Sequence, residues 1–118
     1  MGNSKAEIGG VVETVGYISA FKTIDCPTTG NVSSTSGRIE ITNVVKIHIS
    51  SESFERRVIF ADNEEDISTK LTSEDARLYK ADEEIILDVA AHPNKYVYIG
   101  TTESSDQTNG IRASFYNV

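Results

Sequence analysis

The clearest pattern in the chain is an alternation of apolar and polar residues over residues 38–50. The apolar positions are Ile39, Ile41, Val45, Ile47 and Ile49. Charged or polar side chains stand between them, and only Asn43 and Val44 break the alternation. Because successive side chains of a strand point to opposite faces, this period of two predicts a strand with one face in a core. The other face, which carries Lys46 and His48, is expected to meet solvent or a ligand.

One strand is expected before this segment and one after it. Residues 11–25 are rich in β-branched and aromatic side chains, a composition typical of strands. Gly16 lies inside that run, and a glycine within a strand often marks a bend or a bulge. Residues 54–60 follow with Phe54, Val58 and Phe60 on one side, which Arg56 shares.

A helix is expected near the middle of the chain, after an acidic loop over residues 62–68. Thr72 and Ser73 are residue types that cap a helix N-terminus, and Glu74 and Asp75 complement its positive dipole end. The sequence therefore predicts a short helix from Thr72 to about Lys80.

The segment that follows predicts a hairpin. Residues 84–91 have strand character, although Ile86 makes the apolar run nearly continuous. Pro93 and Asn94 supply a turn, so we expect residues 96–101 to pair back on residues 84–91.

A last strand is expected over residues 111–116. It follows Asn109-Gly110, which is a strong signal for a two-residue hairpin turn. Three strands, a helix and two strands are also the order of the OB-fold barrel, and a bent first strand that contains a glycine is similar to the first strand of that fold. The sixth strand departs from the OB-fold pattern.

The order of elements fits more than one β architecture. A sandwich or an open sheet with one helix gives almost the same pattern as the barrel. We therefore expect a mainly β fold, either a small antiparallel barrel with OB-like strand order or a β-sandwich, with one short α-helix. A chain of 118 residues has the usual length of one domain, so residues 1–118 are taken as a single β-rich domain.

The composition indicates the class of protein and its cellular location. With 38% hydrophobic and 25% charged residues the chain resembles a globular protein. No apolar stretch approaches the roughly 20 residues that cross a bilayer, and the first residues lack the apolar core of a secretory signal. Cys26 is the only cysteine, so no intramolecular disulfide forms. We expect a soluble, cytoplasmic protein without membrane contact.

The net charge of −7 is unevenly distributed. Residues 62–88 hold ten acids and three bases, whereas the rest of the chain holds eight of each. This acidic segment is expected to attract a basic protein or a cationic small molecule and to repel polyanions. The candidate ligand-binding residues in it are Asp62, Glu64, Glu65 and Asp66.

Metal and catalytic sites are not expected. Asp62, Glu64 and Asp66 alternate as in a calcium loop, but Ile67 and Ser73 stand where an EF-hand needs glycine and glutamate. No third nitrogen or sulfur ligand accompanies the two histidines. Cys26 lacks an evident activating base. We expect no catalytic residues, metal or cofactor, and an enzyme of unknown class is the third alternative.

Two function classes remain ahead of an enzyme. Tyr96 and Tyr98 share a strand face and could stack on bases, with Lys46 and His48 beside the phosphates, as in an OB-like single-stranded nucleic-acid-binding protein. The acidic balance makes nucleic acid the weaker alternative. The leading hypothesis is a non-catalytic binding or interaction module that forms a homo-oligomer, because open sheets leave strand edges that another copy can cover.

Overall fold

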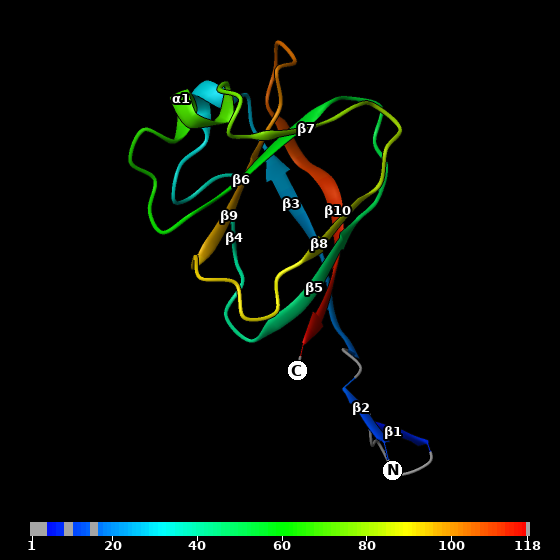
Figure 1. Cartoon of the computed structure of the whole chain (residues 1–118). Coiled ribbons are helices and arrows are strands. Elements are labelled where there is room, and N and C mark those ends of the chain that lie inside the picture. The colour runs from blue at the N-terminus through cyan, green and yellow to red at the C-terminus, as the bar shows by residue number, and fades with distance from the viewer. Residues whose placement is uncertain (1–4, 9–10, 15–16, 118) are drawn as a thin grey trace.

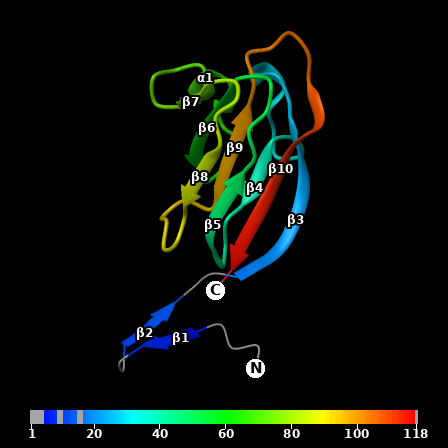
Figure 2. The ribbon, with the colours of Figure 1, turned by 90° about the vertical axis from the view of Figure 1, so that its right-hand side faces the viewer.

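A computed structural model describes residues 5–8, 11–14 and 17–117, with side chains from residue 20 onward. Two four-stranded antiparallel sheets pack face to face as a sandwich (Figures 1 and 2). The first sheet has the order β3 (Tyr17–Cys26), β10 (Gln107–Asn117), β5 (Val44–Ile49) and β8 (Ile85–Asp88). The second sheet has the order β4 (Arg38–Glu40), β9 (Tyr96–Gly100), β6 (Arg56–Ala61) and β7 (Arg77–Tyr79).

The two sheets bury a common core, and one of them is also covered on its outer face. Inward side chains of both sheets form the main core, including Ile39, Ile47, Val97 and Ile111. A smaller cluster lies outside the second sheet, where α1 (Ile67–Leu71) and the short 3-10 helix η1 (Thr29–Asn31) pack. We call β4–β9–β6–β7 the covered sheet and β3–β10–β5–β8 the uncovered sheet.

A third, two-stranded sheet precedes the sandwich. It consists of β1 (Lys5–Ile8) and β2 (Val11–Thr14), which pair antiparallel with each other. This hairpin stands apart from the two larger sheets in both views (Figures 1 and 2). The long strand expected over residues 11–25 is therefore two strands in different sheets, and the glycine expected to bend it, Gly16, lies outside the described residues.

The mainly β class with one short helix is confirmed, and the sandwich is the architecture found. The barrel alternative with OB-like strand order is wrong, because the strands form two open sheets. The conformation of residues 38–50 explains part of the difference between the expected barrel and the observed sandwich. Asn43 adopts a left-handed conformation with φ of 62°, and the Val44 amide donates to the Ile41 carbonyl in a tight turn. The expected single strand thus becomes β4 in one sheet and β5 in the other.

The helix lies earlier than predicted. It begins after Asp66, and the residues expected to start a helix instead close this one. The Thr72 hydroxyl donates to the Ser68 and Thr69 carbonyls, and the Ser73 hydroxyl donates to Lys70. These hydroxyls satisfy carbonyls at the helix C-terminus, a role that the sequence does not distinguish from N-capping.

Both predicted hairpins are wrong. Strand β8 pairs with β5, whereas β9 pairs with β4 and β6 in the other sheet. Asn109 and Gly110 lie inside β10, at a register shift between Gln107 and Ile111. Asn109 has a φ of 50°, and its amide donates to the Asp25 carboxylate at 2.7 Å. The positive φ that favours a hairpin turn is used here for a β-bulge.

Candidate functional site

The uncovered sheet carries a straight row of side chains across its outer face. Strand register places Phe21 opposite Ser114, Ser114 opposite His48, and His48 opposite Ile86. The row therefore crosses all four strands, with an apolar side chain at each end and two polar side chains between them. Phe21 is 74% exposed and Ile86 is 58% exposed. The two large apolar side chains are thus exposed on one sheet face, separated by Ser114 and His48.

A shallow hollow lies beside Phe21 on this face. It has a volume of about 550 Å³ and is lined mainly by side chains of β3, β10 and β5, among them Thr23, His48 and Arg112. The hollow and the row define the surface that we call the outer face.

Charges of both signs surround the row. The His48 imidazole Nε2 lies 3.3 Å from a carboxylate oxygen of Glu84. The Lys46 ammonium lies 4.3 Å from the centre of the Tyr116 ring, and Lys46 stands opposite Asp88 in the register. Two of the predicted site residues, Lys46 and His48, are thus neighbours on the outer face. Their surroundings are electrostatically mixed and lack the excess of positive charge that phosphates need.

Tyr96 and Tyr98 lie on the other sheet, away from Lys46 and His48. Their rings contact edge to face with 6.2 Å between centroids, and the Arg38 guanidinium lies 4.2 Å from the Tyr96 ring centre. Tyr98 is fully buried under α1 and η1. The four residues proposed to line one nucleic-acid site are therefore divided between the outer faces of two sheets, and Tyr98 is not accessible to a base.

The Tyr98 hydroxyl is buried without a hydrogen-bond partner among the described residues. Burial raises the pKa of Tyr98, an effect that the nearby Arg38 guanidinium partly offsets.

The acids of residues 62–66 are exposed, and two of them are engaged in local hydrogen bonds. Asp62 accepts from the Lys95 amide at 3.0 Å and from the Asn94 side chain at 3.3 Å. Glu64 accepts from the Ser34 amide in the loop after η1. Glu65 and Asp66 lie beside them at the start of α1.

The remaining acids of the segment lie elsewhere. Glu84 and Asp88 belong to the outer face of the uncovered sheet, and the side chain of Glu83 accepts from the Lys80 amide at 2.6 Å. The acidic segment is continuous in sequence but is distributed over several surfaces. Binding of a basic partner at residues 62–66 stays a prediction.

Cys26 is placed where nucleophilic chemistry is disfavoured. Its side chain is fully buried in the main core. Burial raises the pKa of the thiol to about 12, and the neighbouring Arg56 only partly opposes that effect. Because the thiolate is the nucleophile, this environment favours an inert packing role.

The described part of the chain contains no group of side chains that could bind a metal ion. Within it, no three His, Cys, Asp or Glu side chains lie close enough to hold an ion. His92 stacks on Phe60 with 3.8 Å between ring centroids, and its Nδ1 accepts from the Asn94 amide. None of the described helices has the length and apolar character needed to span a bilayer.

Sequence reasoning missed the two apolar ends of the row. The sequence contains a signal for Ile86, because this residue interrupts the alternation of residues 84–91 and adds a large apolar side chain to the face of the strand that carries Glu84 and Asp88. The sequence contains no comparable signal for Phe21, since nothing in it indicates which face of the strand is covered by other elements. Comparison of the chain with protein-family models, curated proteins and solved structures finds no match.

Proposed function

We propose that this protein is a non-catalytic interaction module that associates with a second copy of itself through the outer face of the uncovered sheet. The observation that carries the proposal is the row Phe21, Ser114, His48 and Ile86. Its two apolar ends are exposed to 74% and 58%. The outer face of the other sheet, by contrast, is packed against α1 and η1.

The row is self-complementary. A two-fold axis parallel to the strands and midway between β10 and β5 places Phe21 of one copy against Ile86 of the other. The same axis places Ser114 against His48. Each apolar end thereby covers the opposite end of the other copy, which is the arrangement that a symmetric dimer requires. The mixed charges around the row avoid the repulsion that a face of one sign would create.

The area of the face sets the strength of the association. Four strands about 4.8 Å apart and about six residues long give roughly 400 Å² per copy, at about 3.3 Å per residue. Two copies then bury roughly 800 Å², below the 1,200 to 2,000 Å² of stable complexes. The proposal is therefore a weak, concentration-dependent dimer.

The β1–β2 hairpin gives separate support to self-association. Within the described residues its strands pair only with each other. A two-stranded hairpin is marginally stable alone in water. Contact with a second copy would stabilise it and enlarge the interface.

Sedimentation velocity over a wide concentration range tests the proposal. We expect the native protein to shift from monomer to dimer as concentration rises. Phe21→Thr keeps strand propensity and removes the aromatic ring. Loss of an aromatic contact that contributes about 2 kcal/mol weakens a complex about 30-fold. Leu78→Thr is the matched control, because Leu78 is 41% exposed on β7 of the covered sheet.

Two results would contradict self-association. One is a native protein that stays monomeric at every concentration. The other is a Phe21→Thr variant that dimerises as well as the Leu78→Thr control. Single-stranded DNA belongs in the same experiment, because Phe21, Lys46 and Arg112 could also meet bases and phosphates. DNA binding that Phe21→Thr abolishes, without any native dimer, would assign the outer face to nucleic acid.

A further inference from the structure

A second candidate site opens between the two sheets, on the side of the sandwich where β3 and β4 are both edge strands. The cavity there has a volume of about 290 Å³. Its walls include Ile39, Val44 and Phe115, which are 3%, 7% and 6% exposed and belong to the main core. The cavity therefore reaches side chains of the main core, each of which presents only a small part of its surface there.

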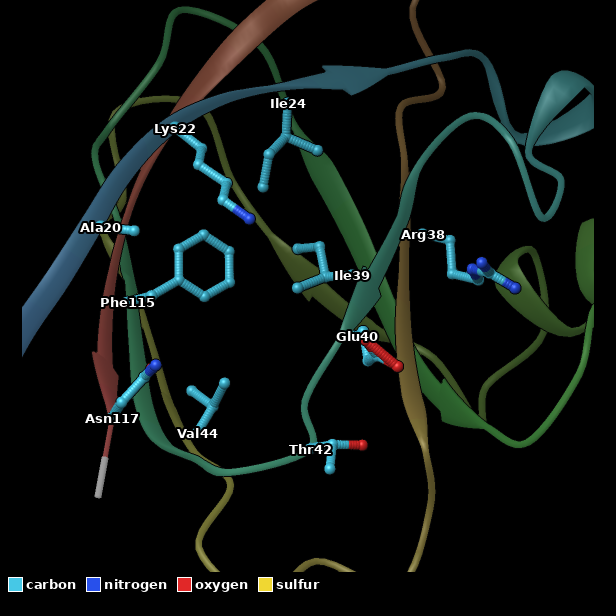
Figure 3. Close-up of a pocket in the computed structure, with 10 residues that line it drawn as sticks. All are labelled: Ala20, Lys22, Ile24, Arg38, Ile39, Glu40, Thr42, Val44, Phe115 and Asn117. Carbon is cyan, nitrogen blue, oxygen red and sulfur yellow. The ribbon is translucent and has the colours of Figure 1, made fainter.

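Polar and apolar side chains share the lining of this cavity, and two of the polar groups face its apolar wall. Figure 3 shows the Lys22 ammonium and the Asn117 amide nitrogen pointing toward the Phe115 ring, whereas the heads of Arg38 and Glu40 turn away from it. The Lys22 Nζ lies 5.3 Å from the centre of the Phe115 ring. Among residues 20–117, no carboxylate forms a salt bridge with Lys22. The Asn117 side-chain oxygen is buried without a hydrogen-bond partner in that same part of the chain.

We propose that this cavity binds a small carboxylate with an apolar body. The apolar part would pack against Ile39, Val44 and Phe115, and the carboxylate would accept hydrogen bonds from the Lys22 ammonium and the Asn117 amide. A concave site in which a few polar groups converge beside apolar side chains is the usual form of a small-molecule site. Lys22, which forms no salt bridge among residues 20–117, brings a positive charge to the mouth of the cavity, and that charge favours an anion over a cation. The proposal is independent of self-association, because the cavity opens between the sheets and not on the outer face.

The cavity volume sets the size of the ligand. A water molecule occupies about 30 Å³ of liquid, so a space of 290 Å³ corresponds to about ten non-hydrogen atoms. Octanoate has that size and one carboxylate, which makes it a suitable probe. Octanol and octylammonium have nearly the same apolar body, with a neutral and a positive head.

The test is a titration of the ¹⁵N-labelled protein with each of the three probes, followed by amide chemical shifts. We expect octanoate to bind most tightly and to shift amides of β3, β4 and β10 around the cavity. Lys22→Gln should weaken octanoate about tenfold or more, because hydrogen bonds to charged groups are the stronger ones. The same substitution should leave octanol binding unchanged.

Lys46→Gln is the matched control. Lys46 also lies over an aromatic ring of β10, Tyr116, but on the outer face of the same sheet. We expect this variant to bind octanoate as the native protein does. Ala20→Leu narrows the cavity from β3 and should weaken all three probes. The proposal is overturned by the absence of octanoate binding, by equal affinity for octylammonium, or by shifts confined to the outer face.

Discussion

Arg56 joins two loops to β6 from inside the sandwich. Its side chain is fully buried on the core-facing side of the strand. The guanidinium donates to the main-chain carbonyl of Ser50 at 3.0 Å, to that of Lys80 at 3.3 Å and to that of Glu83. Burial lowers the pKa of Arg56, and the acids around it oppose the shift. One side chain thus holds the loop after β5 and the loop between β7 and β8.

Arg56→Met tests this arrangement, because methionine keeps much of the apolar stem and removes every donor. A hydrogen bond to a charged group contributes about 1.5 to 3 kcal/mol, so three of them set an upper limit of about 4 to 9 kcal/mol. Two effects reduce it. The desolvation cost of the guanidinium disappears, and Lys80 and Glu83 lie in exposed positions where water can reach the freed carbonyls. We expect a net loss of about 2 to 4 kcal/mol.

Urea unfolding followed by circular dichroism measures the change. The midpoint should fall while the slope stays constant, since the surface exposed on unfolding is nearly the same. Arg77→Met is the control, because Arg77 is exposed on β7 and lies 5.0 Å from the Tyr79 ring centre. Its loss should be below about 1 kcal/mol. An Arg56→Met variant as stable as the native protein would show that the guanidinium contributes no net stability, because the substitution removes its donors and leaves the three main-chain acceptors in place.

Three further predictions concern buried groups and backbone. The pKa of Cys26 is raised to about 12, so the folded state keeps a proton that the unfolded state releases above about pH 8.5. Stability should therefore fall by about 1.4 kcal/mol per pH unit above that pH. Between about pH 8.5 and 10, below the range in which the raised pKa of Tyr98 adds a decline of its own, Cys26→Ala should lack this fall in urea unfolding. Tyr98→Phe removes a buried hydroxyl that has no hydrogen-bond partner among residues 20–117 and should leave the urea midpoint unchanged or higher; a clear decrease would show that the hydroxyl contributes a hydrogen bond to stability. Gly37→Ala should cost about 1 to 3 kcal/mol or more, because Gly37 has a φ of 81° and a Cβ there would meet the Ile99 carbonyl oxygen at 2.5 Å. Gly30→Ala, with open space around it, should cost less in the same assay.

The identity and period of the strands could be predicted from local pattern. Ile39, Ile47 and Ile49 alternate with polar residues, and all three are buried in the main core. Arg56 shares the core-facing side of its strand, as its spacing from Phe54 and Val58 indicates. These features depend on the two-residue repeat of an extended chain, which is a local property.

The candidate sites could be predicted only in part. Lys46 and His48 lie on the solvent side of their strand, as the alternation indicates, and they share the outer face with Ile86 and Phe21. Grouping them with Tyr96 and Tyr98 failed, since β5 and β9 belong to different sheets. Distance along the chain does not reveal that division.

Local pattern predicts most of the extended segments and the mainly β class, but residues 77–79, expected in a helix, form β7, and β1 is not predicted. The pairing of the strands became evident only in the folded molecule, because it depends on contacts between residues far apart in the chain. Asn43 and Asn109 illustrate the limit: each adopts a positive φ, yet one turns the chain into the other sheet and one makes a bulge within a strand. The covering of one sheet by α1 and η1, and the exposure of Phe21 on the other, follow from that long-range pairing and not from local preference.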